Sequence, residues 1–294
     1  MKNTITHVDW RADIQNIEFE SIDFDFVLFD NNKLMQVFDY PFKLDISVVI
    51  ICVKGIMEGS INLKRYSVKA PGLFVVLADQ ILQYENLSED FTGHFIIMSN
   101  KFSNNLLIDI NDRFPLTNSI LDNPWIPLDD EELKSMVEFY TVLKKAVRLK
   151  KNPHRIDVIK HLTQAFFLSS SYLFNKNIDT SKKTKQKVLA EDFLNLVKAN
   201  YKKHRGLDFY AQKLFLTPKY LSSTLKRSSG KSANEWINDF VILEAKALLS
   251  STNLTIQQVS DELNFPSQSF FGKYFKRNVQ ISPKEYRFNK INSK

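Results

Sequence analysis

A short pattern of residues occurs twice in the last third of the chain, and it constrains the fold more than any other feature. The two copies are offset by 50 positions, from segment 217–236 to segment 267–286. The pairs that keep this offset are Thr217 and Ser267, Leu221 and Phe271, Leu225 and Phe275, Lys226-Arg227 and Lys276-Arg277, Ser232 and Ser282, Glu235 and Glu285, and Trp236 and Tyr286. Such a repeat indicates a duplicated supersecondary unit.

The second copy predicts a helix, a tight turn and another helix. Thr255 followed by Gln258 forms a capping box, which starts a helix. That helix is expected to end at Asn264, because asparagine tolerates the left-handed conformation and Pro266 prevents continuation. A second helix is expected from Ser267. The residues it should place inward are Phe270, Phe271 and Phe275.

The first copy predicts the same arrangement, with a helix over Leu207–Leu214 and a second helix capped by Thr217-Pro218. The leading helices are offset by 49 positions and the trailing ones by 50, so the two turns differ by one residue. Two short helices joined by such a turn describe a helix-turn-helix, whose second helix enters the DNA major groove. The alternative is an apolar helix pair of the kind found in any small helical domain.

The outward faces of the two trailing helices favour DNA binding over that alternative. Neither face carries a carboxylate, whereas a merely solvated face usually mixes Glu with Lys. Short polar side chains and lysines near the helix start suit base edges, and cations further along suit phosphates. The predicted base-contacting residues are Lys219, Ser222, Ser223, Gln268, Ser269, Gly272 and Lys273. The predicted phosphate-contacting residues are Lys226, Arg227, Lys276 and Arg277.

The distribution of charge points the same way. Residues 180–294 contain 21 Lys and Arg against 9 Asp and Glu, a net charge of +12. Residues 1–179 contain 19 against 24, a net charge of −5. A basic C-terminal part joined to a slightly acidic N-terminal part is typical of a module that binds a polyanion, attached to a domain with another task.

These segments resemble the AraC/XylS-type transcriptional regulators over roughly residues 187–290. The motifs that carry the resemblance are Ala245-Lys246-x-Leu248-Leu249, Ile256 to Leu263-Asn264-Phe265, Ser269-x-Phe271 to Phe275-Lys276, and Ser282-Pro283-x-x-Tyr286-Arg287. The chain departs from the family at three positions: Asn264 and Gln280 stand where the family usually has glycine, and Val241 stands where it commonly has arginine. Gln280 therefore predicts a different bend of the last turn, and Val241 removes a cation from the linking helix.

Residues 14–99 have the texture of an antiparallel β domain, with short β-branched and aromatic runs between Asn, Asp and Gly. The expected strands are Phe24–Phe29, Leu34–Phe38, Asp45–Lys54, Ser60–Leu63, Tyr66–Ala70, Leu73–Leu77, Ile81–Glu85 and Gly93–Met98. Strands without intervening helices predict a barrel or sandwich. The family resemblance implies a cupin-like barrel that often receives a small effector. Whether the interior is a cavity or a filled core is left open, with Tyr40, Tyr66 and Tyr84 as candidate polar groups in it.

The β region does not favour an enzyme. Its one histidine is His94, too few imidazoles for a metal centre, so neither metal nor cofactor is expected. No nucleophile elbow, phosphate-binding glycine loop or catalytic dyad occurs. Cys52 is the single cysteine; it lies in an apolar run, which indicates a buried strand position and suits a reducing compartment. No leader or long apolar span is found, so a cytoplasmic protein with no membrane partner is expected.

Helical periodicity follows the β region. Acidic residues 129–132 start one amphipathic helix, and a second, rich in phenylalanine, follows Asn152-Pro153. The phenylalanines exceed what one domain needs, and in the resembling family such helices mediate dimerisation, so a homodimer is expected. Further on, Asn234–Ser250 should form one continuous helix that holds the two helix-turn-helix units apart.

The sequence thus predicts an α+β chain with an N-terminal antiparallel, cupin-like β-barrel (residues 1–128), a helical pair for dimerisation (129–178), a linker (179–186) and an all-α double helix-turn-helix domain (187–294). The first hypothesis is a sequence-specific transcriptional regulator, with double-stranded DNA, a second copy, the transcription machinery and a small-molecule effector as candidate partners. The second is a small-molecule-binding barrel protein whose basic tail binds nucleic acid without sequence preference.

Overall fold

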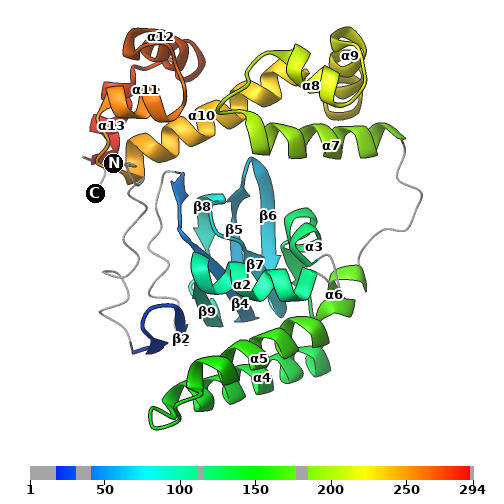
Figure 1. The fold of residues 1–294 in the computed structure, drawn as a ribbon, viewed down its shortest axis with the longest axis vertical. Helices are drawn as coiled ribbons and strands as arrows, with labels where there is room; N and C mark the ends of the chain where they lie inside the picture. The colour runs from blue at the N-terminus through cyan, green and yellow to red at the C-terminus, as the bar shows by residue number, and fades with distance from the viewer. Residues whose placement is uncertain (1–17, 31–40, 112–115, 177–184, 292–294) are drawn as a thin grey trace. The chain divides into compact units, whose positions relative to one another are not determined.

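A computed structural model describes residues 18–30, 41–111, 116–176 and 185–291 (Figure 1). The chain divides into two compact units, one made mainly of residues 7–178 and the other mainly of residues 179–294. Within the described residues, no helix combines the length and the apolar character needed to cross a membrane.

The N-terminal unit contains two antiparallel sheets. The first has the order β1-β2-β9-β4-β7-β10, with β1 Glu20–Ile22, β2 Phe26–Phe29, β9 Thr92–Ser99, β4 Ile46–Lys54, β7 Gly72–Val76 and β10 Trp125–Pro127. The second has the order β3-β8-β5-β6, with β3 Phe42–Lys43, β8 Ile81–Leu87, β5 Ile56–Ile61 and β6 Lys64–Lys69. The described strands therefore form two sheets, and the predicted barrel is not closed.

Both faces of the six-stranded sheet are covered, which explains the nearly continuous apolar run in β4. Val49 and Ile51 point to a core shared with the helices, whereas Ile50 and Cys52 point to a second core shared with the four-stranded sheet. This alternation is the period-two pattern of a strand. Cys52 is fully buried, as expected, and Tyr66 and Tyr84 pack against the second core.

Most predicted strands are confirmed within a few residues. The segments that the sequence did not indicate are β1, β3 and β10, which are two or three residues long. The expected strand Leu34–Phe38 and Tyr40 lie outside the described residues. Strands as short as β1, β3 and β10 carry too few alternating positions to be recognised by periodicity.

The described part of this unit also contains the helices α2 Asn100–Asn111, α3 Leu116–Asp122, α4 Asp130–Arg148, α5 Arg155–Ser169 and α6 Ser171–Lys176. The acidic start of α4 is a capping box, in which Asp129 accepts from the amide of Glu132 and the Glu132 carboxylate accepts from the amide of Asp129. The phenylalanines of α5 are not a surplus, because Phe166 and Phe167 are buried in the core of their own chain. This corrects one of the two arguments for a dimer, the surplus of phenylalanine; the dimer itself stays a prediction.

The C-terminal unit is all helical. Its elements are α7 Lys185–Asn200, α8 Leu207–Lys213, α9 Pro218–Ser229, α10 Ala233–Ser251, α11 Ile256–Glu262, α12 Gln268–Val279 and α13 Pro283–Ile291. The predicted linker 179–186 lies mostly outside the described residues, and its last two positions belong to α7. Helix α10 is continuous, as predicted, and runs between the α8–α9 pair and the α11–α12 pair (Figure 1).

The two tight turns share one hydrogen-bond pattern. In the first, the amides of Phe215 and Leu216 donate to the carbonyls of Gln212 and Ala211, and the amides of Asn264 and Phe265 make the corresponding bonds in the second. The turn residues are left-handed, with φ of 56° at Phe215 and 53° at Asn264. The equivalence at an offset of 49 confirms the predicted registers; Pro266 is the extra residue of the second turn.

The two remaining departures from the family pattern behave differently from expectation. Gln280 ends α12 at φ 72° and ψ −10°, and Gly230 ends α9 at φ 74° and ψ −11°. The predicted difference in bend is therefore wrong, because glutamine accepts the same left-handed conformation at an energetic cost. Val241 is fully buried in α10, so this position belongs to the core rather than to a cationic surface.

Phe215 offers a direct test of backbone strain. A bulky residue with positive φ is unfavourable, and its ring is 94% exposed, so little packing offsets the strain. Phe215→Gly is expected to raise the free energy of unfolding by about 1 kcal/mol, since glycine removes the steric penalty. Phe215→Ala is the control, because it removes the ring and keeps the strain. Equal stability of the two variants in urea denaturation would contradict this account.

Candidate nucleic-acid interface

Helices α9 and α12, the trailing helices of the two helix-turn-helix units, start in the same way. The side chains of Thr217 and Ser267 cap them by accepting from the amides of Tyr220 and Phe270, at 3.3 and 3.2 Å. Pro218 occupies the first helical position of α9, where its missing amide needs no partner. The inward residues Leu221, Leu225, Phe271 and Phe275 are all buried. The caps are as predicted, and so are the inner faces, with the exception of Phe270 described below.

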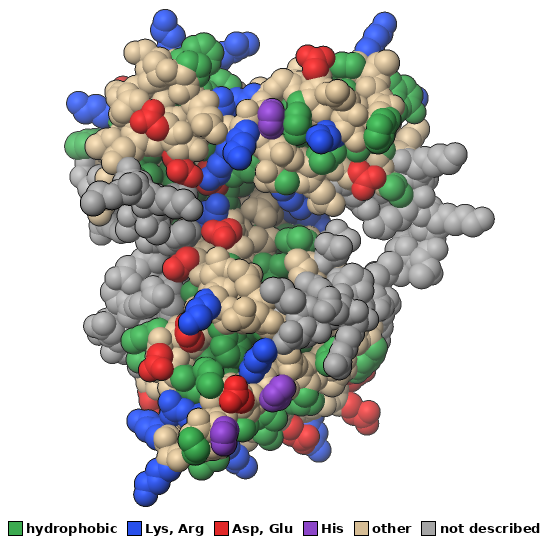
Figure 2. Space-filling model, viewed as in Figure 1, with side chains coloured by type: hydrophobic (Ala, Val, Ile, Leu, Met, Phe, Trp, Pro, Cys, Tyr) green, Lys and Arg blue, Asp and Glu red, His purple; other side chains and the backbone are tan. Residues whose placement is uncertain are grey.

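The predicted DNA-contacting residues lie on the outer surface of these helices. The exposed ones are Lys219, Ser223, Lys226, Arg227, Gln268, Ser269, Lys273, Lys276 and Arg277, and the half-buried ones are Ser222 and Gly272. Lysine and arginine side chains project over α9 and α12 in the space-filling view (Figure 2). The structure thus brings the predicted residues of each unit together on one helix, α9 or α12; which of these residues touches DNA stays a prediction.

Phe270 corrects one prediction. It was expected to point inward, but it is 56% exposed, and Tyr220, at the equivalent position of α9, is 53% exposed. Position 270 lies about 100° around the helix from Phe271, at the flank of the apolar face. Phe270 packs partly on Phe265, with 6.3 Å between ring centroids. The offset of 50 positions pairs Tyr220 with Phe270, so the repeat could have revealed these two exposed aromatic residues.

Helix α10 contacts both recognition units through specific polar bonds. The Tyr274 hydroxyl in α12 donates to Asn238 Oδ1 at 2.6 Å, and Trp236 Nε1 donates to Ser229 Oγ at the end of α9, at 3.1 Å. Burial raises the pKa of Tyr274 to about 12, so its hydroxyl stays a donor at neutral pH. These bonds hold α12 and the end of α9 against α10.

A buried ion pair, which the sequence analysis missed, lies behind the interface. Glu244 in α10 is completely buried, and its Oε1 lies 2.9 Å from Lys202 Nζ. Lys202 also contacts Glu262 Oε1 of α11 at 3.1 Å. Burial alone would lower the pKa of Lys202, but these two carboxylates outweigh it and hold the pKa above its ordinary value. No sequence pattern marks this set, because its members lie far apart in the chain.

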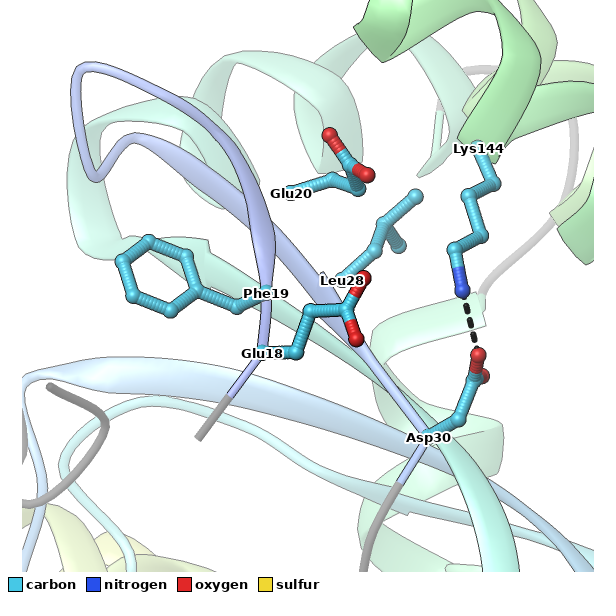
Figure 3. A pocket seen from close by; sticks show the side chains of 6 residues that line it. All are labelled: Glu18, Phe19, Glu20, Leu28, Asp30 and Lys144. Carbon is cyan, nitrogen blue, oxygen red and sulfur yellow. Dashed lines mark hydrogen bonds and ion pairs between the residues drawn. The ribbon is translucent and has the colours of Figure 1, made fainter. Parts of the chain in front are cut away.

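The N-terminal unit contains a small pocket of about 160 Å³, lined by Glu18, Phe19, Glu20, Leu28, Asp30 and Lys144 (Figure 3). Asp30 accepts hydrogen bonds from Lys144 and from His94, and Glu20 accepts from Arg148. Burial raises the pKa of Asp30, but the bonds from Lys144 and His94 lower it to about 2. Two carboxylates of the pocket, those of Asp30 and Glu20, thus bind the side chains of Lys144 and Arg148 in α4. These bonds tie α4 to β1 and to the end of β2, which is a role in the fold.

His94 has no partner cluster for a metal. Its Nδ1 lies 2.8 Å from Asp30, and among the residues that the structure describes no group of three His, Cys, Asp or Glu is arranged to hold an ion. Its ring packs against the Tyr140 ring, tilted by 31° with 4.7 Å between centroids. His94 therefore has a packing role in the described fold.

Comparison with known proteins agrees with the geometry of the C-terminal unit. A family model described as a helix-turn-helix domain matches residues 210–289. The lactose operon transcription activator of Staphylococcus xylosus is 25% identical over 256 residues, 84% of this chain and 86% of that protein. The arabinose operon regulatory protein of Salmonella typhimurium is 34% identical over 84 residues, 29% of this chain and 30% of that protein. A crystal structure of ToxT from Vibrio cholerae aligns at a TM-score of 0.42 and 18% identity, over 90% of this chain and 97% of that one.

Proposed function

We propose that the chain is an AraC/XylS-type DNA-binding transcriptional regulator and, from this premise, that α9 and α12 insert into successive major grooves of one duplex and contact bases there. Base contacts are assigned to the polar residues and glycine of the first turns, and phosphate contacts to the cations of the last turns. The chain would then hold two half-sites on one face of the DNA.

The observation that carries the proposal is the repetition of one exposed, acid-free face on two helices joined by α10. With 19 residues, α10 is about 28 Å long, close to the roughly 34 Å of one turn of DNA. Gly272 fits the same interpretation: a side chain added there would meet nothing within 4 Å, so the fold does not need glycine. Glycine in an exposed helix costs about 1 kcal/mol, and close approach of DNA is a reason to keep it.

Further parts of the proposal concern the rest of the chain. We propose a cytoplasmic regulator without enzymatic activity, whose N-terminal unit controls dimerisation or binds a small effector, and which acts on the transcription machinery. The exposed apolar residues on α4 and α5, among them Val142 and Ile156, support a contact between copies. The core between the two sheets is occupied by side chains, so the effector, if it binds there, must displace them.

Two single substitutions test the division of roles. Gln268→Ala is expected to cost about 1–3 kcal/mol of discrimination at one base pair and to relax base choice there. Lys276→Ala should weaken binding to every sequence alike and reduce the salt dependence by about one unit of slope. Gel-shift titrations on a duplex selected from genomic fragments, and on its point-substituted forms, measure both. Identical behaviour of the two variants on specific and random DNA would contradict the assignment.

The alternative is a small-molecule-binding protein whose basic tail holds nucleic acid without choosing sequence. The charge of residues 180–294 is the observation that favours it, because a net charge of +12 suffices for non-specific binding. Competition with random duplex separates the two functions: a specific regulator keeps a preference of about a thousandfold or more, and a non-specific tail keeps none.

A further inference from the structure

The two helix-turn-helix units are joined at a second place besides α10. Lys202 and Arg205 lie in the turn between α7 and α8, just before the first unit, and both side chains reach the second unit. Lys202 Nζ contacts Glu262, the last residue of α11, at 3.1 Å, and Glu244 of α10 at 2.9 Å. One ammonium group thus ties the entry of the first unit to the linking helix and to the second unit.

Arg205 makes the second of these two connections. Its guanidinium donates to the carbonyl of Leu263 and, at 3.1 Å, to the carbonyl of Asn264, and it lies 3.8 Å from the centre of the Phe265 ring. These carbonyls belong to the C-terminal end of α11, where helical carbonyls lack partners and the helix dipole favours a cation. A residue at the entry to the first unit therefore caps a helix of the second, at the turn that leads into α12.

The contacts of Lys202 and Arg205 restrain the angle between the two units, which α10 alone does not set. The bonds from α10 to α9 and α12 hold each unit at its own end of that helix, whereas a contact between the two ends themselves opposes a change in the angle between the units. A guanidinium suits this task because its planar fork binds two carbonyls in one orientation, and stacking on an aromatic ring fixes its plane. An ammonium would supply the charge without the fixed orientation.

Resting on the function proposed above, we propose that Arg205, supported by Lys202, is a positioning residue that sets the angle between α9 and α12 and so the spacing of the two DNA half-sites that one chain can hold. The free protein is then already arranged for one spacing, which lowers the ordering cost of binding. Without Arg205 the units would adapt to several spacings and bind each of them less well.

The test compares duplexes that differ in the separation of the half-sites. The probes are the selected duplex, the same duplex with one or two base pairs inserted between the half-sites, and a duplex with one half-site scrambled. Each base pair adds about 3.4 Å and about a tenth of a turn, which displaces one half-site from a rigid partner. The proteins are the full chain, Arg205→Ala, Arg205→Lys, and Lys203→Ala as a neighbouring exposed cation outside the link.

The unchanged chain and Lys203→Ala should lose about 10- to 100-fold in affinity on insertion. Arg205→Ala should bind the selected duplex about 10-fold more weakly, lose less than about 3-fold on insertion, and bind the half-site duplex as before. Arg205→Lys should follow Arg205→Ala, and it carries the test should the alanine variant fold poorly. A uniform loss on all duplexes would overturn the inference, because a merely structural role predicts that. Absence of any sequence preference in the unchanged chain would instead overturn the proposed function.

Discussion

Glu244→Ala is expected to lower the free energy of unfolding of the C-terminal unit by about 3–5 kcal/mol, the largest stability effect of any single polar substitution considered. Glu244 is completely buried and its carboxylate lies 2.9 Å from the Lys202 ammonium, whose side chain is only 27% exposed. Removing the Glu244 carboxylate leaves the charge of Lys202 partly desolvated and opens a small cavity in the packing of α10. Urea denaturation followed by circular dichroism measures the change.

Lys202 provides a matched control through its other partner. Glu262 binds the same ammonium at 3.1 Å, but its side chain is 30% exposed, so Glu262→Gln should cost less than about 1 kcal/mol. A double substitution to Lys202→Met and Glu244→Leu should recover most of the lost stability, since a buried pair replaced by apolar groups is often neutral. Equal losses for Glu244→Ala and Glu262→Gln would contradict the role of burial.

The same pair predicts a dependence of stability on pH. The folded pKa of Lys202 lies above its ordinary value, because Glu244 and Glu262 outweigh the effect of burial. A group with a raised folded pKa contributes its full stability below the unfolded pKa and loses it as the pH rises through the folded pKa. The contribution of Lys202 is therefore complete at neutral pH and is lost only under alkaline conditions, and Lys202→Met should remove that loss from the pH profile of stability.

The local structure of the C-terminal unit could be predicted from sequence because its signals lie within a few consecutive residues. Thr255 and Gln258 form a capping box across three positions, and Asn264 followed by Pro266 ends the helix by steric rules. The repeat then gave the register of the first unit from that of the second. By contrast, the bond from Arg205 to the carbonyl of Leu263 spans 58 positions and involves a backbone atom, which no side-chain pattern reports.

The N-terminal unit was less predictable for a related reason. A nearly continuous apolar run, as in β4, shows that both faces of a strand are covered, and a closed barrel and a pair of packed sheets give the same run. Closure depends on which strands pair, such as β4 with β9, whose residues Val49 and Ile96 lie side by side. Phe270 shows the same limit on a helix: its apolar character suggested burial, while its neighbours Phe271 and Phe275 already fill the inner face.

Replacing the four predicted phosphate-contacting residues Lys226, Arg227, Lys276 and Arg277 by alanine is expected to weaken DNA binding by roughly a thousandfold near 0.1 M salt. All four are exposed in the last turns of α9 and α12, where they accompany the base-contacting turns along the groove. Each phosphate neutralised contributes about 0.9 to the slope of log K against log salt concentration, so the slope should become shallower by about 3–4. Binding titrations between 50 and 300 mM salt, roughly the range over which such slopes are linear, measure it.

A matched variant separates direct contact with phosphates by α9 and α12 from general attraction of DNA by the net charge of the chain. Lys134, Lys145, Lys150 and Lys151 are exposed lysines of the N-terminal unit, and replacing them by alanine removes the same net charge from the chain. If phosphates are bound by α9 and α12, this control should change the slope by less than about one unit, because lysines that neutralise no phosphate release no condensed counterions. Similar slopes for the two variants would mean that the whole chain attracts DNA through its charge, and the cations of α9 and α12 would lose their assigned role.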